Sequence, residues 1–132
     1  MNFYIVFCKT KKKFEKYVKI NRIRNKVIVD IKEMINEHEI DIEKNRDYFN
    51  LIVYTKITHA MQKGKSIYYI PDFSKKDIDV TQVYSVKNIF KEYDFKFNAL
   101  VFYKEFLNNE NVKDDIFNFL DMFDNSQLIE DY

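Results

Sequence analysis

The chain has 132 residues, of which 46% are hydrophobic and 33% are charged, and its net charge is +1. It contains one glycine, Gly64, where an average chain of this length has about nine. Walker A loops, dinucleotide-binding fingerprints and nucleophile elbows each need more than one glycine, so the composition excludes all three kinds of site.

The first half of the chain alternates between predicted strands and helices. Residues 2–8 are a continuous apolar run that predicts a buried central strand. In the next segment Phe14, Tyr17 and Val18 lie three and four residues apart, so they share a helix face that packs on the sheet. The predicted elements of this half are the strand 2–8, the helix 11–20, the strand 26–30, the short helix 31–37 and a long helix over about 44–63.

The long helix has apolar residues at three-to-four spacing, and Tyr48 and Ile52 are expected to widen this apolar stripe. Gly64 is expected to end the helix in the left-handed conformation, because glycine adopts that conformation without a steric cost. The residues of the stripe are Phe49, Val53, Ile57, Ala60 and Met61.

The second half continues the alternation. Its predicted elements are a strand 67–70 closed by Pro71, a polar loop 72–79, a helix within 80–93, a strand within 95–103 and one or two helices in the tail. Four apolar strands alternating with helices are typical of a parallel sheet covered on both faces. We therefore expect one three-layer α/β domain over 1–132, with a mostly parallel sheet of about four strands, a core over 1–103 and an acidic helical segment over 104–132.

Charge is unevenly distributed along the chain. From Lys9 to Lys26 there are nine Lys or Arg residues and one Glu, whereas from Glu105 to Tyr132 there are eight Asp or Glu residues and one Lys. This asymmetry indicates an interaction surface. The alternatives are that the two segments face each other or that both remain solvated.

The order strand, basic helix, strand ending in Asp30, long helix, Gly64-Lys65-Ser66, strand, helix and strand resembles the core of the P-loop nucleoside and polynucleotide kinases over residues 2–103. Gly64-Lys65-Ser66 is not itself a Walker A motif, because a helix precedes it and a strand follows it. Where that family has its phosphate loop, this chain has the segment 8–13, which contains no glycine. The resemblance therefore implies a degenerate, non-catalytic relative of the fold.

A residual anion site is one interpretation of the lysines that follow the first strand. Ligands of open α/β sheets bind at the carboxyl ends of strands, and helix N-termini favour anions. Asp30 and Asp72 are expected near the same edge, where they are candidates for a metal ligand or a base. The alternative is that the lysines form a solvated face and the aspartates cap helices or turns. The candidate anion-binding residues are Lys9, Lys11, Lys12 and Lys13.

Two further surfaces are candidates for binding macromolecules. Phe14 and Tyr17 are interleaved with the basic residues, a pattern seen in proteins that bind single-stranded nucleic acid, but their helix spacing places them on the core-facing side. The amphipathic segment 114–123 is a candidate for docking in a partner's groove, and the alternative is that it packs on its own sheet. Its candidate contact residues are Asp115, Phe119, Asp121 and Phe123.

The sequence thus favours a non-catalytic accessory or regulatory protein that binds a host or viral protein. The bias toward Lys, Asn, Ile, Asp, Tyr and Phe is typical of an AT-rich genome such as that of a phage or a low-GC bacterium. The single cysteine, Cys8, excludes an internal disulfide and a thiolate zinc cluster. We expect a cytoplasmic protein with no cofactor, no metal and no membrane contact, while its homo-oligomeric state is left open. The alternatives are a nucleotide- or phosphate-binding enzyme with an atypical lysine loop and a small nucleic-acid-binding protein, which is disfavoured.

Overall fold

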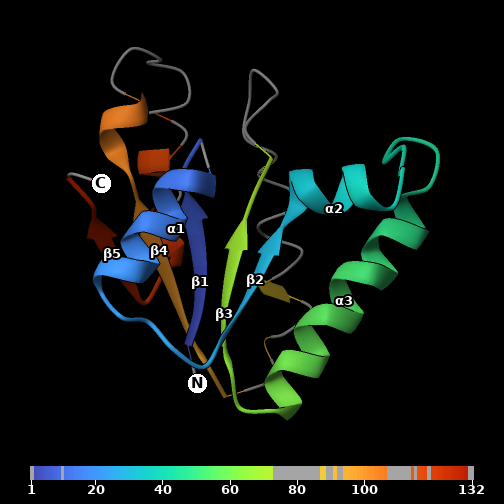
Figure 1. Cartoon of the computed structure of the whole chain (residues 1–132), viewed down its shortest axis with the longest axis horizontal. Coiled ribbons are helices and arrows are strands. Elements are labelled where there is room, and N and C mark those ends of the chain that lie inside the picture. Colours follow the sequence, from blue (N-terminus) through green and yellow to red (C-terminus); the bar gives the residue numbers. More distant parts are fainter. Residues whose placement is uncertain are drawn as a thin grey trace.

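The computed structural model describes residues 2–9, 11–72, 87–88, 91, 94–106, 114, 116–118 and 120–130. Within these residues, five parallel strands form one sheet in the order β2-β3-β1-β4-β5, with helices on both of its faces (Figure 1). The elements are β1 (Asn2–Phe7), α1 (Lys11–Ile20), β2 (Lys26–Asp30), α2 (Ile31–Glu37), α3 (Arg46–Gln62), β3 (Ser66–Ile70), β4 (Lys96–Val101), the 3-10 helices η1 (Tyr103–Phe106) and η2 (Leu120–Met122), and β5 (Asn125–Leu128). The expected three-layer α/β fold is confirmed.

β1 lies at the centre of the sheet because both of its faces are apolar. It pairs with β3 on one side, where Phe3 is in register with Ile67, and with β4 on the other, where Phe3 is in register with Phe97. Ile5, Val6 and Phe7 have no solvent exposure. A strand that is buried on both faces has a continuous apolar sequence, which is the pattern that predicted it.

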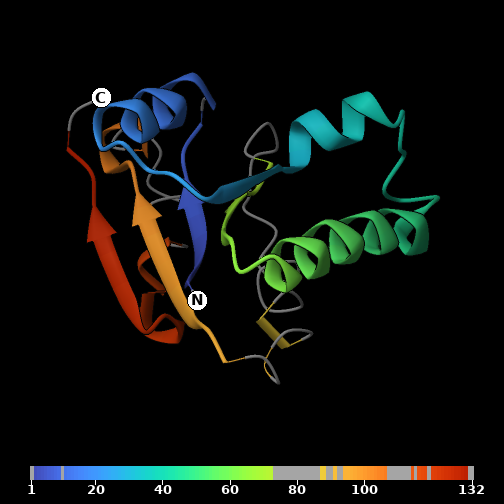
Figure 2. The same ribbon diagram turned by 60° about the horizontal axis from the view of Figure 1, so that its bottom comes forward.

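The two faces of the sheet have separate hydrophobic cores. α1 covers one face through Phe14 and Tyr17, which pack against Tyr68 and Phe102. α2, α3 and the segment near β5 cover the other face, and Figure 2 shows α1 and α3 on opposite sides of the sheet. The buried residues of the α1 face are Val6, Cys8, Phe14, Tyr17, Tyr68, Ile70, Leu100, Phe102 and Ile129.

The helix ends share one geometry although only one of them has the expected glycine. Gly64 has φ +66, as expected, and the backbone N–H of Lys65 donates to the carbonyl of Ala60 at 3.0 Å. Arg22 and Glu39 occupy the equivalent positions after α1 and α2, and both have φ 51. These two ends therefore hold non-glycine residues in a left-handed conformation that costs about 1–2 kcal/mol each.

Several expectations need correction. The sheet contains a fifth strand, β5, which the sequence did not predict because all four of its residues are exposed and lack alternating apolar positions. Tyr48 is 51% exposed rather than part of the buried stripe of α3, because it lies 100° around the helix from the buried Phe49. The helix expected within 80–93 falls mostly outside the described residues. None of the described helices is long and apolar enough to cross a membrane.

Candidate functional site

At the carboxyl end of β1 the chain connections of two neighbouring strands lead to opposite faces of the sheet. β1 leads into α1 on one face of the sheet, whereas the neighbouring β4 leads into η1, whose Phe106 is buried in the core of the opposite face. In open α/β sheets, the crevice between strands whose connections diverge is the usual place for a ligand. Lys9 and the start of α1 lie at this position, as the sequence predicted.

The lysines at this junction are not all available to an anion. The Lys11 ammonium donates a hydrogen bond to the Glu33 carboxylate at the start of α2, and its Nζ lies 3.7 Å from an oxygen of Glu15. The hydrogen bond to Glu33 is the largest cause that raises the pKa of Lys11, so this ammonium stays charged at neutral pH. Lys9 Nζ lies 5.6 Å from the centre of the Phe106 ring. A phosphate at this junction would have to displace or tolerate the Glu33 carboxylate.

Asp30 and Asp72 have different environments. Asp30 is the N-cap of α2, and its Oδ1 accepts a hydrogen bond from the backbone N–H of Glu33 at 3.1 Å, which is the capping role kept as an alternative. Asp72 follows β3 and lines a hollow of about 390 Å³. The other residues that line this hollow are Ile35, Ile40, Asp41, Ile42 and Glu43. No three His, Cys, Asp or Glu side chains in the described part of the chain are grouped to hold a metal ion.

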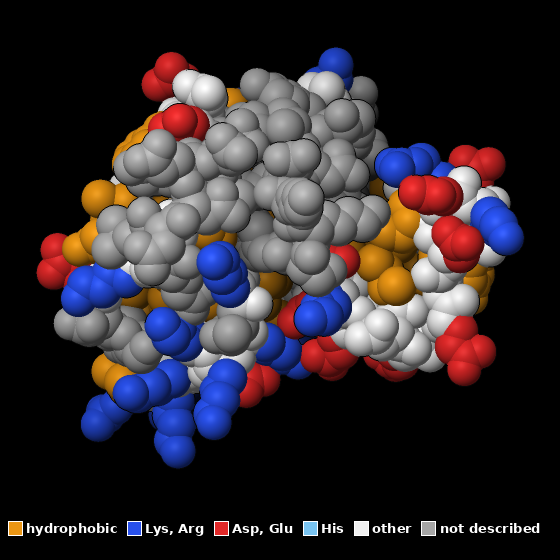
Figure 3. All heavy atoms as spheres, turned by 90° about the horizontal axis from the view of Figure 1, so that it is seen from above, with side chains coloured by type: hydrophobic (Ala, Val, Ile, Leu, Met, Phe, Trp, Pro, Cys, Tyr) orange, Lys and Arg blue, Asp and Glu red, His pale blue; other side chains and the backbone are white. Residues whose placement is uncertain are grey.

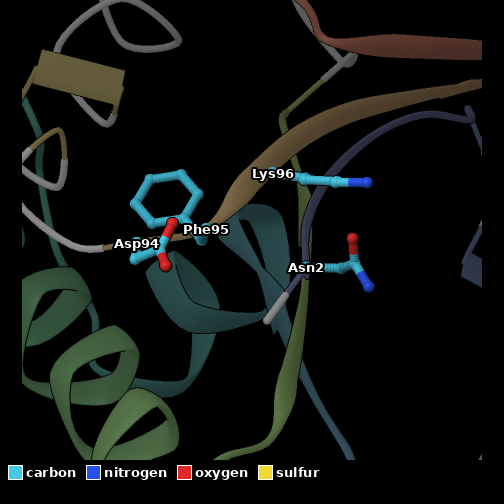
Figure 4. Close-up of a pocket in the computed structure, with 4 residues that line it drawn as sticks. All are labelled: Asn2, Asp94, Phe95 and Lys96. Carbon is cyan, nitrogen blue, oxygen red and sulfur yellow. The ribbon is translucent and has the colours of Figure 1, made fainter.

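A second hollow, of about 300 Å³, lies at the opposite, amino-terminal edge of the sheet (Figure 4). It is lined by Asn2, Asp94, Phe95 and Lys96, none of which the sequence singled out. Figure 4 shows Asn2 and Lys96 extending to the same side, apart from the carboxylate of Asp94. The Oδ1 atom of Asn2 also accepts a hydrogen bond from Asn98 at 3.3 Å. These polar groups do not converge on one point, so they do not form a binding site for a small ligand in this hollow.

Two of the four candidate contact residues in the acidic C-terminal segment, Asp115 and Phe119, lie outside the described residues. Asp121 is exposed, as a contact residue should be. Phe123, in contrast, is buried, and its ring stacks on Phe97 with the ring centres 4.9 Å apart. At Phe123 the segment therefore packs on its own sheet, which is the alternative that the sequence left open.

The most distinctive surface of the described residues is the outer side of α1, which we call the basic face: Lys12, Lys13, Lys16 and Lys19, continued by Arg22 and Arg24, all of them exposed. Figure 3, which looks onto the carboxyl ends of the strands, shows Lys and Arg side chains gathered on the α1 side of the molecule. On the inner side of the helix, Phe14 is fully buried and Tyr17 nearly so. Burial also raises the pKa of the Tyr68 phenol, which packs against Phe14, so this phenol stays neutral.

Comparisons with known proteins give no further guide to the site. A scan against protein-family models and searches of curated proteins and of solved structures found no match to this chain. The geometry of the described residues is therefore the basis for a functional proposal.

The contact between Lys11 and Glu33 leads to a prediction about nucleotides. We expect that millimolar ATP, GTP or deoxynucleoside monophosphates with Mg²⁺ will not shift the thermal unfolding midpoint, because Glu33 already neutralises Lys11 at the start of α1. A ligand at 100 times its dissociation constant would stabilise the fold by about 2.7 kcal/mol, which is several degrees at this size. A clear shift that disappears when Lys11, Lys12 and Lys13 become alanine would instead support the enzyme alternative.

Proposed function

We propose that this chain is a non-catalytic accessory or regulatory protein that docks the basic face of α1 on an acidic surface of a partner protein. The observation that carries the proposal is the arrangement of α1. Its inner side is held by Phe14 and Tyr17, while its outer side presents cations interrupted by Glu15 and followed at the end of the helix by the exposed Ile20. Such a helix gives a partner a positively charged surface on a firmly packed support, which favours electrostatic complementarity.

The charges of Lys12, Lys16 and Lys19 on the basic face are not used within the described structure. Lys12, Lys16 and Lys19 form no ion pair with any described residue, whereas Lys11 at the start of α1 is paired with Glu33 and Glu15. Among the described residues, these lysines therefore do not pair with the acidic C-terminal segment, which argues against the alternative that the two segments neutralise each other. Unpaired cations that share one helix face are available to an anionic partner.

A folded acidic protein fits this surface better than a nucleic acid does. Non-specific binders of single strands combine cations with exposed aromatic rings on which the bases stack. In α1 the aromatic rings point into the core, so the basic face offers phosphate contacts without stacking. The net charge of only +1 also means that a long polyanion would meet acidic groups elsewhere on the molecule.

The same proposal treats the chain as a degenerate relative of the P-loop kinases. The all-parallel sheet and the position of the Lys9–Lys13 segment after the central strand support it. Because a backbone without glycine there cannot wrap a phosphate closely, the lysines would serve recognition of a partner instead of catalysis.

The proposal is tested by anisotropy titrations with labelled poly-L-glutamate, used as an acidic polypeptide, and with oligo-dT of the same charge. We expect the chain to bind poly-L-glutamate with an affinity that falls as salt rises. The variant K12E/K16E/K19E should lose about tenfold or more, because exposed ion pairs contribute up to about 1 kcal/mol each.

The matched control is K44E/K63E/K96E, which makes the same charge change at three exposed lysines away from α1. It should retain most of the affinity. An equal loss in both variants would mean that net charge alone drives binding and would contradict a role for the basic face. Tighter binding of oligo-dT than of poly-L-glutamate would favour the nucleic-acid alternative.

A further inference from the structure

The outer side of α3 differs from the rest of the described surface. Phe49, Val53 and Ile57 hold the inner side of this helix on the sheet. On the outer side, Leu51 is 61% exposed and Tyr48 and Tyr54 are also largely exposed. These side chains, together with the exposed Thr55, His59 and Gln62, define what we call the uncharged face of α3. A helix that is apolar on more than its core-facing stripe usually has a second contact.

The lack of charge on this face is unusual for this chain. A third of all residues are charged, yet between Tyr48 and Gln62 the only Asp, Glu, Lys or Arg is Lys56, which is half-buried on a flank. The exposed side of α1 is basic, and α2 exposes Lys32 and Glu37. Among the described α-helices, α3 alone presents an uncharged outer face, which begins after the exposed Arg46 and Asp47 of its first turn. Figure 2 shows that its N-terminal half, with α2, extends beyond the β2 edge of the sheet, where another molecule can approach it.

We propose that the uncharged face of α3 binds the same face of a second copy of this chain, so that two α3 helices pack antiparallel about a two-fold axis. Two such faces are matched in charge, because burying an unpaired charge is costly and an uncharged face therefore needs an uncharged partner surface. The other large apolar side chains exposed in the described structure, Ile20, Phe117 and Leu128, lie on separate elements. Among the described elements only α3 offers a continuous surface of this kind, and a two-fold axis brings such a surface against itself.

The size of the face sets the strength of the dimer. From Tyr48 to Gln62 the helix is about 21 Å long, and one helix pair of this length buries less area than a standard protein interface. The dimer is therefore weak and depends on protein concentration. It leaves α1 free, because α1 lies on the opposite face of the sheet, so the inference is independent of the proposed function.

Sedimentation equilibrium of the full chain, from about 10 μM to about 1 mM, tests the inference. We expect the weight-average mass to rise from the monomer value of 16.2 kDa toward twice that value as concentration increases. Leu51→Glu should keep the chain monomeric throughout, since it places a charge within the interface at its most exposed apolar side chain. Because Leu51 is largely exposed, this variant should retain its far-UV circular dichroism and its melting temperature.

Ile20→Glu is the matched control, because Ile20 is 56% exposed and lies on α1. It should dimerise like the unmodified chain. A chain that remains monomeric over the whole concentration range would overturn the inference. A dimer that survives Leu51→Glu, or that Ile20→Glu disrupts equally, would overturn the assignment to α3.

Discussion

Replacing Phe14 with alanine should lower the free energy of unfolding by about 3–5 kcal/mol, the usual cost of removing a buried phenylalanine side chain. Phe14 has no solvent exposure, and its ring centre lies 5.3 Å from that of Tyr68 and 6.5 Å from that of Phe102. The substitution leaves a cavity between α1 and the sheet. Urea denaturation followed by circular dichroism measures the loss.

The control for this prediction is Lys12→Ala, two residues away on the exposed side of α1. It should change stability by less than about 0.5 kcal/mol, as surface substitutions usually do. If Phe14→Ala lowered the free energy of unfolding no more than Lys12→Ala does, the Phe14 ring would not be what holds α1 on the sheet. The basic face would then lack the rigid support that the proposal assigns to it.

Phe123→Ala should have a comparable effect on the opposite face, again about 3–5 kcal/mol. Its ring stacks on Phe97 and meets the edge of Phe7, with ring centres 6.1 Å apart in the second pair. The next residue, Asp124, accepts a hydrogen bond from the backbone N–H of Phe97 at 2.8 Å. Loss of the Phe123 ring should therefore also speed hydrogen exchange of the β5 amides.

Phe117→Ala is the matched control for this second prediction, because Phe117 is 52% exposed. The two variants remove the same side chain from one segment, so a difference between them reports burial alone. Equal and small effects would mean that Phe123 is not part of the core. Phe123 would then again be a candidate for contact with a partner.

Most of the sheet and its helices could be predicted from local patterns. The approximate boundaries predicted for α1 and α2, and the predicted bounds of β2, agree with the structure, because each element has a clear apolar spacing and a polar connection. The continuous apolar run of β1 likewise predicted its central position. Gly64 correctly predicted the end of α3, since glycine is the usual residue there.

β5 could not be predicted because its stability comes from distant partners. Its residues Asn125–Leu128 are polar or exposed, and they pair through backbone hydrogen bonds with β4, in which Asn98 is in register with Asn125. The side chain of Asn125 also donates to Asn98 at 3.2 Å. Neither contact leaves a periodic signal in the sequence.

The candidate site was only partly predictable for the same reason. The position of Lys9 and Lys11 at the carboxyl end of β1 followed from element order. The pairing of Lys11 with Glu33 did not, because the two residues are 22 positions apart and meet only when α1 and α2 converge at that edge. The exposure of Tyr48 and Leu51 depends on which side of α3 faces the sheet, and apolar residues all around that helix left this ambiguous.

The most direct test of the basic face is a two-dimensional ¹H–¹⁵N NMR titration of the full chain with poly-L-glutamate. We expect amide shifts to change over α1, from Lys12 to Lys19, and in the following turn through Arg24, while α3 and β5 remain unaffected. Changes centred on any other surface, or no changes at all, would contradict the proposal that α1 is where this protein meets its partner.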